Sequence, residues 1–478
     1  MLSLEENVVR IDLAPGMHIH IVGIGGAGMS AIARVLLGRG FRVSGSDKLS
    51  NAQTAALAAE GIQVYAGHKA THIDGADIVV VSSAVPASNV EWAAAVTQGL
   101  PVLKRADLLG ILMQGMDGIA VAGSHGKTTT TGMIAHILLE CGLDPTVILG
   151  GTLAELGGNG HFGRGNHFVV EADEYDYMFL GLRPAIAVIT NIEHDHPDLF
   201  PTAEAYRAAF HRFIDLLPTG ARLIVCVDDP GALELLAEMR PLDINLSTYG
   251  LGDASLAPNA RALDVRPNQM GGSDFVVEMN GQPVGLARIR VPGLHNVRNA
   301  LAALVVALEL EIDFAQACRA LAGFGGVQRR FQIVGEASGI TVIDDYAHHP
   351  TEIQATLAAA RQRFPGRRLW AVWQPHTFSR TRLMLDEFAA SFAQADRVIA
   401  LDIYASREAD DPGINTAVVV ERMGHSGAVY IPDRRTAAEY LLERLRPDDI
   451  VLTLGAGDGD AVGRWVLEGL QLTQGIKR

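Results

Sequence analysis

The stretch GIAVAGSHGKTTTTGM (118–133) constrains the fold most, because an apolar run ends in glycine and leads into a lysine and four threonines. A strand, a glycine turn and a helix start in this order are typical of a loop whose backbone N–H groups surround an anion. Lys127 is suited to reach terminal phosphates, and Thr128 to hold a magnesium ion. Two residues separate Gly123 from Gly126, where the usual phosphate loop has four. We interpret the stretch as a nucleotide site, although the loop alone does not separate a kinase, an ATPase and a ligase.

A second glycine turn, GIGGAG (23–28), follows an apolar strand and opens a helix with the spacing G-x-G-x-x-G. Asp47 ends the next strand at about the spacing of a ribose-binding acid. Taken alone, this turn favours an NAD-dependent oxidoreductase. A dehydrogenase has no need of the loop at Lys127, however, and the same turn would serve any diphosphate, including that of a nucleotide sugar. Both interpretations stay open at this point.

Alternating strands and helices along the chain predict parallel α/β layers. Three segments each begin with a short apolar strand that runs into a glycine or polar turn. We therefore predict three α/β domains: a Rossmann-like domain over 1–115, a central P-loop-like domain over 116–325 and a C-terminal Rossmann-like domain over 326–478. Residues 240–292 carry short strands and many turns, which predicts an antiparallel patch in the central domain.

Polar side chains end two further strands of the central segment, at EADEYD (171–176) and NIEHDH (191–196). Carboxyl ends of parallel strands meet at one edge of a sheet, so these turns should converge on the loop at Lys127. Glu171 offers the oxygen ligands that magnesium prefers, and His196 would join it or support it. Solvated loops are the alternative for each turn taken singly, but three polar strand ends in one sheet favour a site.

The third segment has polar strand ends with histidines and arginines. His348 and His376 are of the type that titrates near neutral pH. Arg380 or Arg382 offers a planar fork for a carboxylate. Asn296, near a helix start in the central segment, is suited to reading an adenine edge. A single histidine is more often structural than catalytic, and it is the clustering of these histidines at strand ends that favours a site.

The charge balance narrows the partners, because the 478 residues carry a formal net charge of -15. Binding a nucleic-acid polymer needs clustered Lys and Arg, so that class is disfavoured. No apolar run has the length that membrane insertion requires, and MLSLEENVVR at the N-terminus lacks the pattern of a signal peptide. The three cysteines form no C-x-x-C pair. We expect a cytoplasmic protein, monomer or dimer.

Eight motifs in order make the chain resemble the Mur ligases over nearly its whole length. They are GIGGAGMS (23–30), GSHGKTTTT (123–131), EADEYD (171–176), NIEHDH (191–196), HNVRNALAA (295–303), GVQRRF (326–331), DDYAHHPTE (344–352) and QPHTFSRTR (374–382). The resemblance implies that the first domain holds the UDP part of a sugar nucleotide, the second ATP and Mg²⁺, and the third the incoming amino acid. The implied reaction is ATP-dependent amide formation in peptidoglycan synthesis. The carboxylate of UDP-N-acetylmuramate becomes an acyl phosphate, which the amine of L-alanine attacks.

The resemblance also assigns roles residue by residue. As catalytic residues it implies Lys127, Glu171, His196, His348 and Arg380. For ATP it implies Gly123, Ser124, His125, Gly126, Lys127, Thr128, Thr129, Asn296, Arg330 and Asp345. For the two other substrates it implies Gly25, Asp47, Ser82, Arg105, Tyr346, His376 and Arg380. The metal ligands it implies are Thr128, Glu171 and His196.

Two positions depart from the alanine-adding members of the family. Tyr175 stands where those members often have serine, and Thr377 where many carry arginine. Tyrosine is common at the first position in a sister ligase that attaches a whole tripeptide to UDP-N-acetylmuramate during cell-wall recycling. That ligase is therefore one alternative; an NAD-dependent oxidoreductase and a non-catalytic, nucleotide-gated binding protein are the others.

Overall fold

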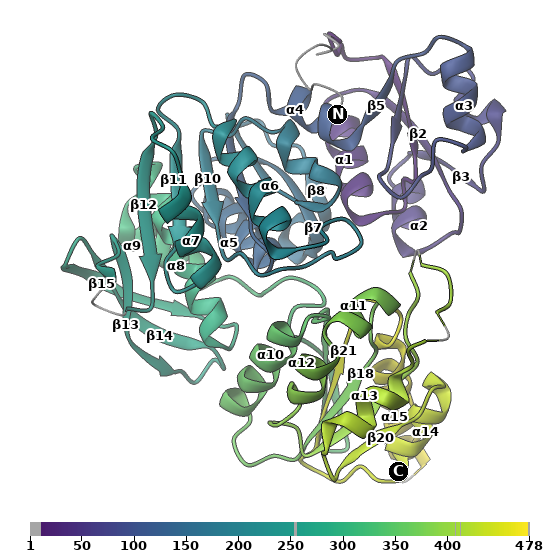
Figure 1. Ribbon diagram of the computed structural model, residues 1–478, viewed down its shortest axis with the longest axis vertical. Coiled ribbons are helices and arrows are strands. Elements are labelled where there is room, and N and C mark those ends of the chain that lie inside the picture. The colour runs from purple at the N-terminus through teal and green to yellow at the C-terminus, as the bar shows by residue number, and fades with distance from the viewer. Residues whose placement is uncertain (1–10, 253–255, 407, 412, 477–478) are drawn as a thin grey trace.

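The computed structural model describes residues 11–476 except 253–255, 407 and 412, and its three sheets form three lobes (Figure 1). The sheets span residues 18–104, 117–289 and 332–454. The predicted architecture of three α/β domains is thereby confirmed.

The N-terminal sheet is parallel throughout, in the order β3-β2-β1-β4-β5. Two of its inner strands, which begin at His18 and Ile78, are buried on both faces because helices cover both. The strands are β1 (His18–Val22), β2 (Arg42–Asp47), β3 (Gln63–Ala66), β4 (Ile78–Val81) and β5 (Val102–Lys104). The helices are α1 (Ala27–Gly38), α2 (Ala52–Ala59), η1 (Ala70–Ile73), α3 (Val90–Thr97) and α4 (Arg105–Met113).

The central sheet has ten strands in the order β15-β14-β13-β12-β11-β10-β6-β9-β7-β8. Its strands are β6 (Asp117–Ala122), β7 (Thr146–Leu153), β8 (Gly158–His161), β9 (His167–Glu171), β10 (Ile186–Ile189), β11 (Arg222–Cys226), β12 (Asn245–Gly250), β13 (Ala260–Pro267), β14 (Ser273–Met279) and β15 (Gln282–Ile289). Its helices are α5 (Lys127–Glu140), η2 (Ala154–Leu156), η3 (Tyr175–Gly181), α6 (Ala203–Asp215), α7 (Pro230–Glu238), α8 (Leu294–Glu309) and α9 (Phe314–Leu321).

The antiparallel patch expected over 240–292 is confirmed for β13, β14 and β15. It is wrong for β12, which pairs in parallel with both β11 and β13. The reason is the crossover helix α7, which returns the chain so that β12 runs in the direction of β11. Helix α7 precedes residues 240–292, so the turns within that range carry no sign of the crossover.

The C-terminal sheet runs β16-β17-β21-β18-β19-β20, and β16 alone is antiparallel to its neighbour. Its strands are β16 (Gln332–Ala337), β17 (Ile340–Asp345), β18 (Leu369–Trp373), β19 (Arg397–Ala400), β20 (Ala428–Tyr430) and β21 (Ile450–Leu454). Its helices are α10 (Pro350–Arg363), α11 (Phe378–Leu383), α12 (Leu385–Ala390), α13 (Thr416–Met423), α14 (Arg434–Leu442) and α15 (Asp460–Ile476).

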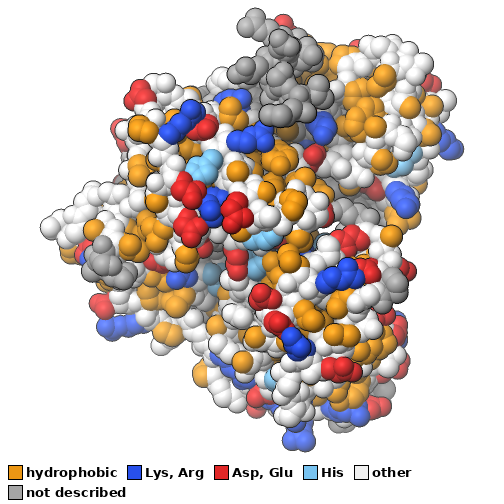
Figure 2. All heavy atoms as spheres, viewed as in Figure 1, with side chains coloured by type: hydrophobic (Ala, Val, Ile, Leu, Met, Phe, Trp, Pro, Cys, Tyr) orange, Lys and Arg blue, Asp and Glu red, His pale blue; other side chains and the backbone are white. Residues whose placement is uncertain are grey.

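Two packing features position the functional loops. Helix α5 is buried from Thr128 to Leu138 and packs on α8, so the loop before it is held from both sides. Helix α1 of the N-terminal domain lies against β7 and β8 of the central domain (Figure 1). On the face seen in Figure 2, acidic and basic side chains are intermixed. Within the described part of the chain, no helix combines the length and apolar character that crossing a bilayer takes.

Candidate active site

The phosphate loop depends on its two glycines. Gly123 has φ +133°, and a Cβ there would lie 2.1 Å from Oγ1 of Thr190. Gly126 has φ +80°, and a Cβ there would lie 2.7 Å from Oδ1 of Asn299. Gly126 is also the N-cap of α5 and offers no capping side chain, so the first N–H groups of the helix remain available to an anion.

Lys127, the first residue of α5, contacts the carboxylate of Glu174, a residue that the sequence analysis did not single out. Its Nζ donates to the carbonyl of Gly123 at 2.5 Å and to Oε2 of Glu174 at 2.9 Å. Glu174 is fully buried and also accepts from the hydroxyl of Tyr206 at 3.0 Å. Burial by itself lowers the pKa of Lys127, but Glu174 and Asp173 outweigh it and raise that pKa, so the lysine stays charged.

Glu174 is ionised for the reciprocal reason. Burial raises its pKa, but Lys127 and His196 outweigh that effect and hold the pKa at about 2. The structure therefore places a fixed negative charge directly behind the phosphate-loop cation. Glu174 lies in the same EADEYD turn as Glu171, so the polar strand end was a usable signal, but sequence does not tell which of the acids reaches the lysine.

The predicted metal ligands come together only in part. Oγ1 of Thr128 donates to Oε1 of Glu171 at 2.5 Å, and Oε2 of Glu171 accepts from the backbone N–H of Gly150 at 2.5 Å. His196 instead approaches Glu174, with Nε2 3.5 Å from Oε1. A separate group, His125, Glu193 and His349, has one possible ligand atom from each residue within 4.8 Å of the others.

The third domain reaches this edge of the central sheet through a buried ion pair. Nη2 and Nε of Arg380 donate to Oδ1 of Asp195 at 2.6 and 3.1 Å, and both side chains are 4% exposed. Nη1 of Arg380 lies 3.3 Å from Nδ1 of His376. The ring of His348 lies between those of Tyr346 and His376, with centroid distances of 5.3 and 5.8 Å. The residues predicted to hold the amino acid therefore do gather.

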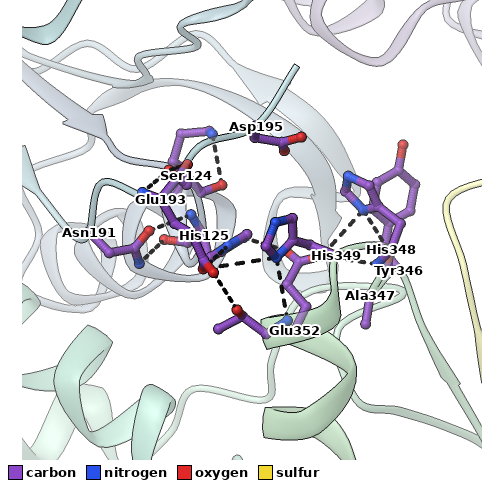
Figure 3. Close-up of polar contacts among 12 residues, drawn as sticks. Ser124, His125, Asn191, Glu193, Asp195, Tyr346, Ala347, His348, His349 and Glu352 are labelled. Carbon is purple, nitrogen blue, oxygen red and sulfur yellow. Dashed lines mark hydrogen bonds and ion pairs between the residues drawn. The ribbon is translucent and has the colours of Figure 1, made fainter. Parts of the chain in front are cut away.

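A second set of charges links the phosphate loop to the start of α10 (Figure 3). His125 places Nε2 3.0 Å from Glu193 and Nδ1 3.2 Å from Glu352. Burial lowers the pKa of His125, but these two carboxylates outweigh it and raise the pKa to about 10. Thr351 donates to Glu193 at 2.7 Å, and Arg330 lies 3.5 Å from Glu352. Figure 3 shows His125 and Glu193 facing His349 and Glu352 across the domain boundary.

A cavity of about 290 Å³ opens between these two domains. It is lined by the phosphate-loop residues His125, Gly126 and Thr129 and by residues predicted to grip ATP, namely Asn296, Arg330 and Asp345. Asn296 is buried and donates from Nδ2 to the carbonyl of Pro292 at 2.7 Å. Burial raises the pKa of Asp345 to about 6 against the opposing charge of Arg330. Ser124 is turned from the cavity and donates to the carbonyl of Glu193 at 2.7 Å.

The first glycine turn gathers the residues predicted for the UDP-sugar. The N–H of Gly25 donates to Oδ2 of Asp47 at 2.8 Å, and a Cβ on Gly23 would lie 2.9 Å from Cβ of Ser82. A Cβ on Gly28 would lie 2.7 Å from Cζ of Arg105. The buried Nε of Arg105 has no hydrogen-bond partner among the described residues. Nη1 of Arg105 donates to Asp173 of the central domain at 3.2 Å. The first glycine turn therefore also faces the phosphate loop.

Comparison with known families decides between the readings of the two glycine turns. The model of the Mur ligase family catalytic domain matches residues 18–116, that of the Mur ligase middle domain 121–307, and that of the Mur ligase glutamate ligase domain 329–457. The chain belongs to the Mur ligase family. Membership favours the ligase interpretation over the oxidoreductase and over a binding protein without catalysis.

Three relatives describe where this Mur ligase lies in the family. It is 46% identical to the UDP-N-acetylmuramate–L-alanine ligase of Renibacterium salmoninarum, over 97% of this chain and 98% of the relative. The solved UDP-N-acetylmuramate–alanine ligase MurC of Thermotoga maritima superimposes with a TM-score of 0.80 at 29% identity, over 96% of this chain and 100% of that one. The solved murein peptide ligase of Psychrobacter arcticus gives 0.72 at 27% identity, over 95% and 99%.

Proposed function

We propose that this Mur ligase uses ATP to join L-alanine to the carboxylate of UDP-N-acetylmuramate, through an acyl phosphate, in the cytoplasmic synthesis of peptidoglycan precursors. One observation carries the proposal: phosphate-loop residues of the central domain and Arg330, Asp345 and Glu352 of the third domain line a single cavity. The similarity to curated alanine ligases over nearly the whole chain supports the choice of substrates.

The residues present fit a magnesium nucleotide. Thr128 and Glu171 offer adjacent oxygens of the kind that Mg²⁺ prefers, and the bare N-terminus of α5 suits phosphate oxygens. Bound there, Mg²⁺ would neutralise charge on the phosphates. Asn296, Arg330 and Asp345 would hold the nucleotide from the other wall of the cavity. His196, which contacts Glu174, would support this centre from behind.

Lys127 is assigned to charge stabilisation during phosphoryl transfer. Glu174 keeps the ammonium protonated and fixed in place, so it does not have to reorganise as charge develops. The lactoyl carboxylate has to reach this lysine from the N-terminal domain. Gly25, Asp47, Ser82 and Arg105 are assigned to the UDP part, and the unpartnered Nε of Arg105 fits an anion such as a diphosphate.

The amino acid is assigned to the pocket of Tyr346, His348, His376 and Arg380. Nε and Nη2 of Arg380 donate to Asp195. We therefore assign Nη1, which lies beside His376, to the carboxylate of the amino acid. A small apolar niche would recognise the alanine methyl, and one methyl is worth about 1–3 kcal/mol, so glycine would be disfavoured but not excluded.

The second candidate is the tripeptide-attaching ligase, which Tyr175 favours. The hydroxyl of Tyr175 donates to Asp198 at 3.2 Å, and the ring of Tyr175 packs edge-on against that of His196 with a centroid distance of 5.0 Å. The two candidates differ only in the amine, so they share every prediction about ATP and the sugar nucleotide.

The mass of the product separates them. UDP-N-acetylmuramate, ATP and Mg²⁺ are supplied with an equimolar mixture of L-alanine, glycine, L-serine and L-alanyl-γ-D-glutamyl-diaminopimelate. We expect a product heavier by one alanine residue, formed with ADP and inorganic phosphate. A product carrying the tripeptide would transfer the assignment to the second candidate. Reduction of NAD⁺ in a parallel sample that contains NAD⁺ and no ATP, without any amide product in the first sample, would overturn the ligase assignment itself.

A further inference from the structure

We propose that Asn159, on the hairpin formed by β7 and β8 of the central domain, is a positioning residue for the sugar nucleotide. It fixes the start of α1, in the N-terminal domain, relative to the phosphate loop. The inference rests on the proposed function, because it assumes that the diphosphate binds at the glycine turn before α1.

Asn159 spans the domain boundary with its whole amide group. It is 1% exposed. Its Nδ2 donates to the carbonyl of Ala27 at 2.6 Å and to Oγ of Ser30 at 2.9 Å, and its Oδ1 accepts from Arg34. Ala27 is the first residue of α1 and lies within the glycine turn GIGGAG. A residue of the central domain therefore holds the first turn of the helix that faces the proposed diphosphate.

Close packing makes this contact rigid. A Cβ on Gly160 would lie 2.3 Å from the carbonyl oxygen of Ala31, so the backbone of β8 rests directly on α1. A Cβ on Gly38, at the far end of α1, would lie 2.5 Å from Cβ of Phe162. The hairpin thus contacts α1 along its length, and Asn159 supplies the polar contact at its functional end.

The other strand of the same hairpin, across from Asn159, is part of the phosphate-transfer centre. The N–H of Gly150 donates to Glu171 at 2.5 Å, and a Cβ on Gly151 would lie 3.0 Å from Cγ2 of Thr128. The N–H of Gln328 also donates to the carbonyl of Thr152, in the hairpin, at 3.0 Å. The hairpin therefore connects α1, through β8, to the residues assigned to the metal, through β7, and hydrogen bonds fix both strands.

This geometry predicts an effect on the reacting distance and not on nucleotide affinity. Asn159 touches none of the residues assigned to the UDP part or to ATP. Loss of its amide would let α1 shift against the central domain, and misplacement of a reacting group by about 1 Å costs on the order of a hundredfold in rate.

The test compares Asn159→Ala with Phe162→Ala, which removes a contact of the same hairpin at the other end of α1. For Asn159→Ala we expect kcat to fall roughly tenfold to a hundredfold. The KM for ATP and the Kd for UDP, measured by calorimetry with UDP itself, should stay within about threefold, since their contacts remain. Phe162→Ala removes a side chain that is 36% exposed, and it should leave kcat within about threefold.

Equal kcat values for the two variants would overturn the inference and make Asn159 a packing residue. A rise in the Kd for UDP that matches the fall in kcat would also overturn it, because the residue would then act within the N-terminal domain alone. Failure of the wild-type enzyme to ligate L-alanine would instead count against the proposed function.

Ser30→Ala keeps the inference testable if Asn159→Ala does not fold. It removes one partner of Asn159 on the opposite side of the boundary, and we expect kcat to fall several-fold. The double variant should be no slower than Asn159→Ala, because both changes break the same contact. Fully additive losses, or a Ser30→Ala enzyme with wild-type kcat, would contradict the inference.

Discussion

The central domain meets its two neighbours through contacts of opposite chemistry. Towards the N-terminal domain it presents the neutral amide of Asn159 and the bare backbone of Gly160. Towards the C-terminal domain it presents buried charges, the pair of Asp195 with Arg380 and the imidazole of His125 between two carboxylates. Close neutral packing sets a distance and holds it, whereas a charged contact can exchange one anion for another.

The two boundaries of the central domain would therefore have different mechanical roles. The sugar nucleotide would be held at a fixed distance from the phosphate loop. The C-terminal domain would exchange partners, because Arg380 and Arg330 now contact carboxylates where substrate anions would bind. The first boundary also carries charge, because Arg34 donates to Asn159 and because Arg105 and Lys104 pair with Asp173 and Asp176. The pair of Arg105 lies at the substrate end of this boundary.

The largest effect should come from Arg380→Ala. Removing one partner of a buried ion pair leaves the other charge uncompensated, at a cost of about 3–5 kcal/mol. Asp195 would be that charge, and the arm assigned to the amino acid would also be lost. We expect kcat/KM for L-alanine to fall by roughly a hundredfold or more, with the KM for ATP changed much less.

Arg382→Ala is the matched control on the same helix. Arg382 is half exposed and pairs with Asp411 at the surface, where ion pairs contribute about 0–1 kcal/mol. Its kinetics should remain close to wild type. Similar losses from both variants would mean that the charged boundary has no special part in catalysis.

A smaller effect is that the stability of the boundary with the C-terminal domain should depend on pH, whereas that of the boundary with the N-terminal domain should not. The pKa of His125 is raised from 6.5 to about 10, so its contribution to stability is complete below pH 6.5 and is lost as the pH rises towards 10. Hydrogen exchange at the start of α10, corrected for the intrinsic rate, should therefore increase over this range. Exchange in α1 should not increase, because its contacts with Asn159, Gly160 and Phe162 contain no group that titrates over this range.

The control for the pH experiment is Glu193→Gln, which removes one of the two carboxylates that raise the pKa of His125. The loosening at α10 should then begin at lower pH. A parallel increase in both helices, or an unchanged profile in the variant, would show that His125 does not distinguish the boundaries.

Much of the fold was predictable because its signals are local. Apolar runs that end in glycine or polar turns located parallel strands in each of the three sheets, and the glycine turns located the starts of α1 and α5. The short parallel strands β3 and β5 were not located. The antiparallel strand β16 escaped prediction because QIVGEA is short and only partly apolar. The parallel pairing of β12 escaped because pairing direction depends on the path of the connecting helix.

The site was predictable up to the identity of the partners. Lys127, Thr128 and Glu171 were found from strand ends, and the structure brings Thr128 and Glu171 into contact. Asp195 lies within a predicted motif, but its partner is 185 residues away in the chain. Asn159 lies in a glycine-rich hairpin without any motif. Such residues act across domain boundaries, and local patterns in a single sequence do not show how separate domains dock.

The most direct test of the account follows one oxygen atom. The central claim is that ATP phosphorylates the carboxylate of the sugar nucleotide. The N-terminal domain holds the sugar nucleotide, and the carboxylate lies beside Lys127 during the transfer. We predict that UDP-N-acetylmuramate labelled with heavy oxygen in its carboxylate passes one labelled oxygen to inorganic phosphate for each amide formed. Label in AMP, with release of pyrophosphate, or inorganic phosphate free of label would contradict the claim.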